Sequence, residues 1–391
     1  MSLVIKMEFA NNVKDLSGSA IRETFKLLSQ PGIISFAGGM PAPELFPGKE
    51  LAEISRDILE NNGSVALQYG ITEGYAPLVE QIRQRLGDKI KQCDSVITTA
   101  GGQGGIYLTA KILLDPGDGV VCESPSFVGA LNCFRAFNAK LFGVELQEDG
   151  MDMTQLEQVL STQKIKFIYT IPNFQNPTGI TASLEKRKKL LELADKYDVL
   201  ILEDDPYGEL RFAGEDITSL KELDDKGRVI YAGSFSKILS PGLRVGFICA
   251  DAVLVEKMSV CKQVVDVHTS VLPQMIASEF MNRYSMTEHV EKQKALYKEK
   301  CEFMLTCVDK YLPVKTTRPE GGLFLWCWGD GETNCLDVYK KAVEQKVAFV
   351  PGNTLMPDMT VKTSAFRLNY STAGFDNIEK GMKILGEVLN G

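Results

Sequence analysis

The sequence predicts an α/β protein with a large, mostly parallel sheet and a second, smaller α+β domain. Between residues 95 and 250, short apolar runs alternate with amphipathic stretches. The apolar runs are almost continuously hydrophobic, as expected of strands in a sheet that is covered on both faces. Strand–helix–strand alternation of this kind indicates parallel strands. The last third of the chain has a different pattern, in which long charged helices surround one aromatic-rich strand.

The expected elements follow in chain order. Seven strands are predicted in the large sheet, at residues 95–99, 119–122, 140–144, 167–171, 199–202, 229–232 and 245–249. Helices are predicted between them at 106–114 and 184–197. The last third should contain a helix at 287–311, a strand at 322–328 and helices at 335–345 and 377–389. We therefore expect an arm or small-domain contribution from residues 1–44, a large domain from 45–284 and a small domain from 285–391.

Composition excludes several kinds of partner and compartment. The chain has 391 residues and a formal net charge of −8, which argues against nucleic acid or an anionic membrane surface as a partner. The longest apolar run, 323–328, is far too short to span a bilayer. The nine cysteines contain no Cys-x-x-Cys pair, a pattern typical of reduced thiols in the cytoplasm.

The histidine count restricts the chemistry further. His268 and His289 are the two histidines of the chain. Two histidines argue against zinc sites built on several histidines, Ser-His-Asp triads and Cys-His pairs, and no metal site is expected.

Polar residues gather directly after the predicted strands, where open α/β sheets bind their ligands. Residues 100–106 read Ala-Gly-Gly-Gln-Gly-Gly-Ile and open a predicted helix. The N–H groups of such a turn can bind an anion, although a simple tight turn is an equal alternative. The G-x-G-x-x-G pattern does not fit, because Tyr107 occupies its last position, and no P-loop pattern is present.

Three further strand ends carry candidate residues. Phe127 follows strand 119–122, where an ordinary core position is the stronger alternative. The Asn-Pro-Thr-Gly turn after strand 167–171 leaves the Asn176 amide free to donate to a ligand. Glu203, Asp204 and Asp205 follow strand 199–202. Desolvating three carboxylates is costly, so a solvated loop is favoured, and only one of Asp204 and Asp205 can face a given ligand.

The most specific stretch runs from residue 233 to residue 246. It places Ser234, Ser236, Lys237 and Arg244 between two predicted strands. A lysine held at a sheet edge can lose its proton through desolvation and attack a carbonyl group. The two hydroxyls and the guanidinium are donors suited to a phosphate dianion. Later in the chain, Arg367 lies in a strand-like run and matches an α-carboxylate, although alone it would be taken for a surface arginine.

Together these residues indicate one cofactor. A phosphate, an aldehyde that meets a lysine, a ring that stacks on an aromatic side chain and a pyridine nitrogen that pairs with a carboxylate describe pyridoxal 5′-phosphate. Asn176 and Tyr207 would donate hydrogen bonds to its phenolic oxygen.

The order of motifs resembles the fold-type-I, class I/II pyridoxal-phosphate aminotransferases over nearly the whole chain. The branch with 2-aminoadipate and kynurenine aminotransferases and the MocR-type regulators is the most similar. The motifs that carry the resemblance are Ile-Ser-Phe-Ala-Gly-Gly-Met-Pro (34–41), Leu-Gln-Tyr-Gly (67–70), Asn-Pro-Thr-Gly (176–179), Ser-Phe-Ser-Lys (234–237), Glu-Gly-Gly-Leu-Phe-Leu-Trp (320–326), Val-Pro-Gly (350–352) and Arg-Leu-Asn-Tyr (367–370).

The resemblance implies a role for each matching position. Lys237 would hold the cofactor and move the substrate's proton, and Asp204, three residues before Tyr207, would pair with the pyridine nitrogen. Arg367 would bind the substrate carboxylate near Gly39, and Arg22 lies in a segment that helps to select side chains. The phosphate would be held by Gly102, Gln103, Ser234, Ser236, Arg244 and, from a second subunit, Tyr69.

Two departures from the family pattern concern the substrate. Phe127 stands where the family often has the stacking tyrosine, and Leu355 stands where it often has phenylalanine. We expect a cytoplasmic homodimeric aminotransferase that moves an amino group from an aromatic, branched-chain or 2-aminoadipate-like L-amino acid to a 2-oxo acid such as 2-oxoglutarate. The alternatives are a carbon–sulfur β-lyase of the same fold and a non-enzymatic effector-binding domain of the MocR type.

Overall fold

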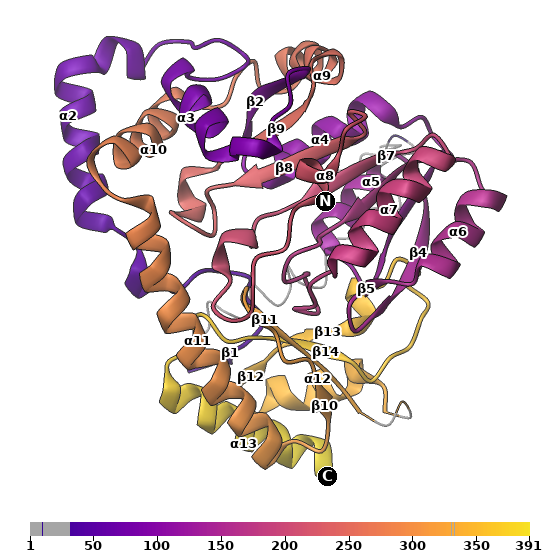
Figure 1. Ribbon diagram of the computed structural model, residues 1–391. Coiled ribbons are helices and arrows are strands. Elements are labelled where there is room, and N and C mark those ends of the chain that lie inside the picture. Colours follow the sequence, from indigo (N-terminus) through magenta and orange to yellow (C-terminus); the bar gives the residue numbers. More distant parts are fainter. Residues whose placement is uncertain (1–9, 11–31, 330, 332) are drawn as a thin grey trace, which may run out of the picture.

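A large sheet forms the centre of the computed structural model, which describes residue 10, residues 32–329, residue 331 and residues 333–391 (Figure 1). The spatial order of its eight strands is β2-β9-β8-β7-β6-β3-β4-β5. Their bounds are β2 (Asp94–Ala100), β3 (Gly119–Ser124), β4 (Lys140–Gln147), β5 (Gly150–Met151), β6 (Ile165–Thr170), β7 (Leu200–Asp204), β8 (Val229–Ser234) and β9 (Val245–Asp251). The prediction of an α/β protein is confirmed.

The sheet has one strand more than predicted. The additional strand, β5, has two residues and pairs antiparallel with the end of β4, through Leu146 opposite Met151. The turn between them returns the chain after only two residues, so β5 has no separate apolar run by which to recognise it. The seven longer strands are the predicted ones, and β9 alone among them runs antiparallel to its neighbours β2 and β8.

Helices cover both faces of the large sheet because its strands are apolar on both sides. One face packs against α6 (Met153–Thr162), α7 (Leu184–Lys196) and α8 (Leu220–Leu223), with Ile168 and Ile201 at the centre of this layer. Against the other face lie α4 (Gly102–Leu113), α5 (Val128–Ala136) and α9 (Ala252–Val265). All strand ends that carry the predicted site residues therefore point to one edge between two helical layers.

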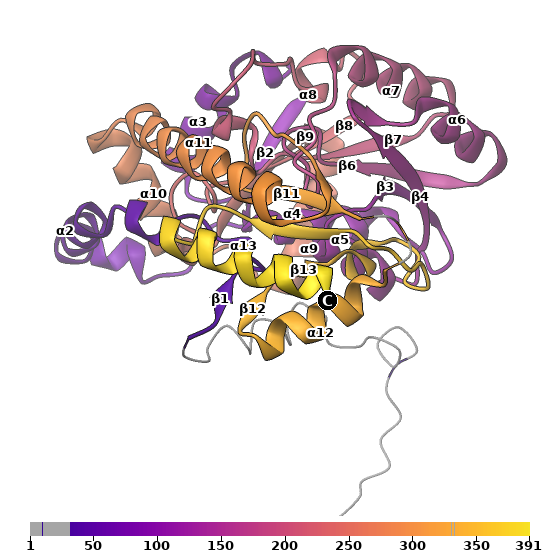
Figure 2. The same cartoon turned by 90° about the horizontal axis from the view of Figure 1, so that it is seen from below.

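The C-terminal part of the chain forms a second layer below this sheet (Figures 1 and 2). Its sheet has the order β10-β11-β14-β13, and a separate parallel pair joins β1 to β12. The strands are β1 (Ile34–Ser35), β10 (Lys315–Thr316), β11 (Phe324–Trp328), β12 (Val347–Ala348), β13 (Val350–Pro351) and β14 (Phe366–Asn369). The helices are α11 (Met286–Tyr311), α12 (Cys335–Glu344) and α13 (Phe375–Asn390).

Three helices complete the part of the chain that the structure describes. They are α2 (Gly48–Ala66), α3 (Ala76–Leu86) and α10 (Val271–Arg283), and α2 packs along α10. The long helix α11 then runs from the end of α10 down to α13 (Figure 1). We propose residues 45–284 and 285–391 as two units of this fold, and the pairing of β1 with β12 supports a small-domain contribution from the described end of the predicted unit 1–44. Residues 1–9 and 11–31 of that unit lie outside the described residues.

The cysteines and the helix lengths bear on the expectations drawn from composition. All nine cysteines are free, and seven of them are buried. Burial raises the pKa of the Cys327 and Cys335 thiols to about 12, so they stay protonated and unreactive. Within the described ranges, no helix combines the length and the apolar character needed to cross a bilayer.

Candidate active site

A cavity of about 280 Å³ opens where the two sheets meet at the strand ends. Its lining includes every predicted site residue that the structure describes except Tyr69. These residues are Gly39, Gly102, Gln103, Phe127, Asn176, Asp204, Tyr207, Ser234, Ser236, Lys237, Arg244 and Arg367, and they are joined by Met40, Ile106, Val128, Ile171 and Pro206. Segments from both ends of the described chain therefore converge on one volume large enough for a small ligand.

The glycine-rich turn and Arg244 form one wall of this cavity. Helix α4 begins at Gly102, so the turn places its free N–H groups at the cavity, and no acidic side chain lies in its first turn. The Nη2 of Arg244 donates to the carbonyl of Ala100 at 3.0 Å. The turn is tightly constrained, because Gly101 has a φ of 72° and a Cβ there would lie 2.5 Å from Nη2. These donors and the positive helix end suit a phosphate group.

Two more residues of this wall are arranged by local hydrogen bonds. Ser236 donates its backbone N–H to the Ser234 hydroxyl oxygen at 3.1 Å, which keeps both side chains at the end of β8. The side-chain amide of Gln103 donates to the carbonyl of Gly129 at 3.0 Å. Gln103 can therefore offer a phosphate its backbone N–H at the start of α4, while its side chain supports the start of α5.

Lys237 lies at the cavity three residues after Ser234, the last residue of β8. Its Nζ donates to the carbonyl of Gly39 at 2.7 Å. Burial lowers the pKa of Lys237 to about 8, and the nearby guanidinium groups of Arg367 and Arg244 also act to lower it. A substantial fraction of the amine is therefore neutral near pH 8, as a nucleophile requires.

The three carboxylates at the end of β7, of which Glu203 and Asp204 belong to the strand, are buried, so the expectation of a solvated loop is wrong. Glu203, Asp204 and Asp205 are each less than a tenth exposed. Glu203 accepts the backbone N–H groups of Leu220 and Lys221, at 3.0 and 2.7 Å. These donors come from a segment that the chain reaches only later, and they offset the desolvation that disfavoured burial.

Asp204 and Asp205 point to opposite sides, as the strand geometry predicts. Asp204 lines the cavity and accepts a hydrogen bond from the Tyr169 hydroxyl at 2.7 Å. Asp205 accepts instead from Asn173 at 3.0 Å and from Tyr231 at 2.9 Å. Burial raises the pKa of Asp204 to about 7, although the bond from Tyr169 acts to lower it. Asp204 is thus the carboxylate that can face a ligand.

Arg367 lies on β14 with its guanidinium inside the protein, so its interpretation as a surface arginine is wrong. It is 4% exposed, and burial lowers its pKa to about 10. Its Nη1 donates to Asn176 Oδ1 at 2.8 Å, and its Nη2 donates to the carbonyl of Ala37 at 2.6 Å. Its Nε is buried without a hydrogen-bond partner among the described residues. Such a cation is well suited to a carboxylate.

Asn176 and Tyr207 lie together, as predicted from their motifs. The Nδ2 of Asn176 is 3.4 Å from the Tyr207 hydroxyl, and both side chains are buried at the cavity. Phe127 contributes its aromatic side chain to the same lining.

Two supporting residues, Tyr169 and Phe324, were missed in the sequence. The Arg367 guanidinium carbon lies 4.3 Å from the centre of the Phe324 ring, and the Tyr207 ring meets Phe324 edge-on. Phe324 lies in the Glu-Gly-Gly-Leu-Phe motif, which could have marked it. Tyr169 gave no local signal, because it lies within an apolar strand like any core residue.

Of the two remaining predicted residues, the structure describes Tyr69 alone, and Tyr69 is not in the cavity lining. Tyr69 is 81% exposed, and its ring meets His268 edge-on. Arg22 lies outside the described residues.

The charges of the cavity match an anionic aromatic cofactor. Among the described lining residues, three cations, Lys237, Arg244 and Arg367, accompany a single carboxylate, Asp204. This excess positive charge fits a phosphate at the α4 turn and a carboxylate at Arg367. The buried amine and the opposed acid also fit an aldehyde-bearing pyridine ring, so the residues present fit pyridoxal 5′-phosphate.

Comparison with known families decides the identity. Residues 43–383 match the family model of class I and II aminotransferases. The chain belongs to this aminotransferase family. It is a pyridoxal-phosphate-dependent enzyme that transfers amino groups between amino acids and 2-oxo acids.

Individual aminotransferases are similar over nearly their full length. The aromatic-amino-acid aminotransferase 1 of Thermococcus litoralis is 38% identical, over 97% of this chain and 94% of its own. The kynurenine aminotransferase of Pyrococcus horikoshii, solved with PMP, superposes with a TM-score of 0.94 at 37% identity, covering 98% and 96% of the two chains. The α-aminoadipate aminotransferase of Thermus thermophilus, complexed with N-(5′-phosphopyridoxyl)-L-leucine, gives a TM-score of 0.91 at 39% identity, covering 98% and 97%.

Proposed function

We propose that the cavity between the two sheets is the active site of this aminotransferase and that Lys237 is its catalytic base and cofactor-binding lysine. The observation that carries this assignment is the convergence of Lys237, Asp204 and Arg367 on one cavity. The lowered pKa of Lys237, which burial brings to about 8, supports a nucleophilic amine.

The cofactor would be held along two walls. Gly102, Gln103, Ser234, Ser236 and Arg244 would bind its phosphate through N–H, hydroxyl and guanidinium donors. Phe127 would stack on its ring, Asp204 would pair with the ring nitrogen, and Asn176 with Tyr207 would donate to its phenolic oxygen. When bound, pyridoxal phosphate supplies an electron sink for the electrons released at the substrate's Cα.

The substrate would be oriented by Arg367 and Gly39. Arg367 would bind the α-carboxylate, and its contact with Asn176 would fix the guanidinium plane beside the cofactor. The Nζ of Lys237 would then remove the proton from the substrate's Cα, hold it as an ammonium group and return it to the reacting molecule later in the reaction. A single amine suffices for this transfer, so no histidine is needed.

We also propose aromatic, branched-chain or 2-aminoadipate-like amino acids as donors and 2-oxoglutarate as acceptor. Met40, Ile106, Val128 and Ile171 make part of the lining apolar, which favours an apolar donor side chain. Among the described lining residues, the cations are those already assigned to phosphate, carboxylate and proton transfer. A second carboxylate would therefore be bound by Arg22, from the N-terminal segment.

The enzyme is further proposed to be a cytoplasmic homodimer in which Tyr69 completes the partner's phosphate site. Tyr69 is 81% exposed beside Leu67 and Ile71, which are 75% and 62% exposed. An apolar, aromatic surface of this kind favours burial against a second copy. The free thiols of the chain support a reducing compartment.

The catalytic assignment is tested with Lys237→Ala. The variant should fold, lose the absorption band of lysine-bound cofactor and lose at least about 10⁴-fold in kcat. A panel of amino acids, each followed by loss of that band and by oxo-acid formation, then identifies the donor. Release of pyruvate and ammonia would indicate a β-lyase, and retained activity in the variant would contradict the assignment.

The shared site is tested by mixing two inactive proteins, Tyr69→Ala and Lys237→Ala. A mixed dimer has one site that combines an intact Lys237 with the partner's intact Tyr69, so activity should return after subunit exchange. If Tyr69 serves its own subunit, the mixture stays at the sum of its components.

A further inference from the structure

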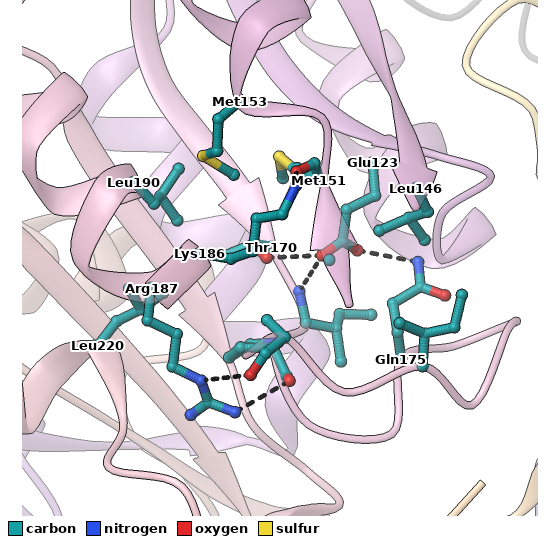
Figure 3. Close-up of a pocket in the computed structure, with 15 residues that line it drawn as sticks. Glu123, Leu146, Met151, Met153, Thr170, Gln175, Lys186, Arg187, Leu190 and Leu220 are labelled. Atoms are coloured by element: carbon teal, nitrogen blue, oxygen red, sulfur yellow. Dashed lines mark hydrogen bonds between the residues drawn. The ribbon is translucent and has the colours of Figure 1, made fainter. Parts of the chain in front are cut away.

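A narrow pocket lies on the side of the large sheet covered by α7 (Figure 3), and Ile171 belongs both to its lining and to that of the candidate active site. It has a volume of about 20 Å³, which holds one water molecule and no substrate. Glu123, at the end of β3, lies in its wall and is 2% exposed. Burial raises the pKa of Glu123 to about 7. A buried acid outside the lining of the active-site cavity therefore needs another explanation.

Each hydrogen bond to the Glu123 carboxylate comes from the strand end or loop that leads to Asn176. Its Oε1 accepts from the Thr170 hydroxyl at 2.6 Å and from the backbone N–H of Ile171 at 3.0 Å. Its Oε2 accepts from the Gln175 side chain at 2.9 Å. Three neutral donors thus meet one carboxylate, which offsets part of its desolvation.

The Gln175 side chain connects the Glu123 carboxylate to two loops of the active site through hydrogen bonds. Its Nε2 also donates to the carbonyl of Pro125 at 2.9 Å, two residues before Phe127. Its Oε1 accepts from the backbone N–H and the hydroxyl of Thr178, at 2.9 and 2.7 Å. The amide is therefore oriented by Glu123, since its nitrogen must face the carboxylate.

We infer that Glu123 is a positioning residue of the active site, which acts through Gln175 to hold Asn176 and Phe127 in place. Asn176 lies between Gln175 and Thr178 in the chain, and its Oδ1 contacts Arg367 at 2.8 Å. Displacing the loop would therefore move the Arg367 guanidinium and the hydrogen bond to Tyr207. The inference rests on the proposed roles of Asn176, Phe127 and Arg367.

Three donors converge on the side chain at position 123, so above the Glu123 pKa of about 7 both of its oxygens act as acceptors, and the test is made at pH 8 or above. A glutamine at 123 has one oxygen and one NH₂ group, so an N–H would face either Gln175 Nε2 or the donors of Thr170 and Ile171. Either orientation sets donor against donor and should displace the loop.

The test compares Glu123→Gln with Glu203→Gln in the cofactor-loaded enzyme. Glu203 is a matched control, because it is also buried at a strand end with a pKa raised to about 7, but it accepts from backbone N–H groups of Leu220 and Lys221. Glu123→Gln should raise the KM for the amino donor about tenfold, with a smaller change in kcat, and should shift the pH midpoint of the bound-cofactor absorption band. Glu203→Gln should change neither.

A swap of the two side chains serves as rescue. In Glu123→Gln with Gln175→Glu, donor again faces acceptor between the two positions, but a carboxylate oxygen then faces the Pro125 carbonyl, so that one contact turns from a hydrogen bond into a repulsion between acceptors. KM should return part of the way toward that of the parent enzyme. Thr170→Val, which removes one donor, should shift KM in the same direction by less and serves if Glu123→Gln does not fold.

Equal KM values and spectra in Glu123→Gln and Glu203→Gln would overturn the inference. Failure of the proposed function gives a different result, since the unaltered protein would then lack the cofactor band that Lys237→Ala removes.

Discussion

The wide cavity of the candidate active site and the narrow pocket of Figure 3 lie at the same sheet edge. Each contains a buried arginine, but the two arginines differ in how fully the protein satisfies their hydrogen-bond donors. In the cavity, Arg367 is buried with its Nε unpartnered among the described residues. In the pocket wall, Arg187 is 1% exposed and all three of its nitrogens donate hydrogen bonds. The difference indicates that Arg367 has a donor available for a ligand, whereas Arg187 uses its donors to stabilise the surrounding loops.

Of the two arginine exchanges, that of the cavity arginine should have the larger effect on activity. Arg367→Lys replaces a planar fork by a single amine, which cannot bind a carboxylate through two parallel hydrogen bonds. We expect kcat/KM for the amino donor to fall about 100-fold, with a smaller loss in the free energy of unfolding than for Arg187→Lys, because Arg367 has two protein acceptors and Arg187 has five. Steady-state kinetics and chemical denaturation measure the two quantities, and a large loss of stability would show that Arg367 has a structural role as well.

Exchanging the pocket arginine should reverse this pattern. In Arg187→Lys, one amine cannot reach the carbonyls of Pro172, Ala182 and Thr218 that Arg187 binds at 3.0–3.2 Å. Unsatisfied buried carbonyls should lower the free energy of unfolding by about 2–4 kcal/mol. Below the unfolding transition, kcat/KM should stay within about threefold of the parent enzyme, so a 100-fold loss would remove the distinction between the two regions.

A smaller effect on kcat should distinguish the hydrogen-bonded pair Tyr169–Asp204 from the pair Tyr231–Asp205. Tyr169→Phe removes the donor to Asp204, and Tyr231→Phe removes the donor to Asp205. Without its donor, the pKa of Asp204 should rise, which weakens its pairing with the ring nitrogen and lowers kcat about tenfold. Tyr231→Phe should leave kcat unchanged at a similar loss of stability. Equal kcat values in both variants would contradict the role of Asp204.

The mildest test uses pH. The pKa of Lys237 is lowered to about 8, and the neutral amine is the nucleophile. Uptake of pyridoxal phosphate by cofactor-free protein should therefore accelerate severalfold from pH 7 to pH 9 and level off above the lysine pKa. Stopped-flow absorbance measures this rate. A rate that still rises steeply above pH 9 would indicate an ordinary lysine with a pKa near 10.5.

Much of the cavity could be predicted because its residues follow strand ends. The alternation of strands and helices, and the stretch from Ser234 to Arg244, are local features with a fixed spacing. The burial of Glu203 could not be predicted, since its donors at Leu220 and Lys221 are brought to it by folding. The bond from Tyr169 to Asp204 likewise joins neighbouring strands and has no local pattern.

Helix α10 also could not be predicted from the local sequence pattern. Helix α10 buries Val271, Gln274, Met275, Ile276, Ala277, Ser278 and Phe280. These positions surround much of the helix, so the sequence lacks the single apolar stripe by which a surface helix is recognised. Helix α4 begins at Gly102, before the predicted start at residue 106, because its first turn contains three glycines and little hydrophobic pattern.

The close approach of the α4 turn to Arg244 has a consequence for how this enzyme can evolve. A Cβ at Gly101 would meet Arg244, and a Cβ at Gly246 would lie 2.6 Å from the carbonyl carbon of Gly101. The three residues thus form an interlocked set, in which a change at one is tolerated only after a change at another. In a mutagenised library selected for new substrates, these positions should stay fixed while Met40 and Val128 vary, so specificity can drift without loss of the phosphate anchor.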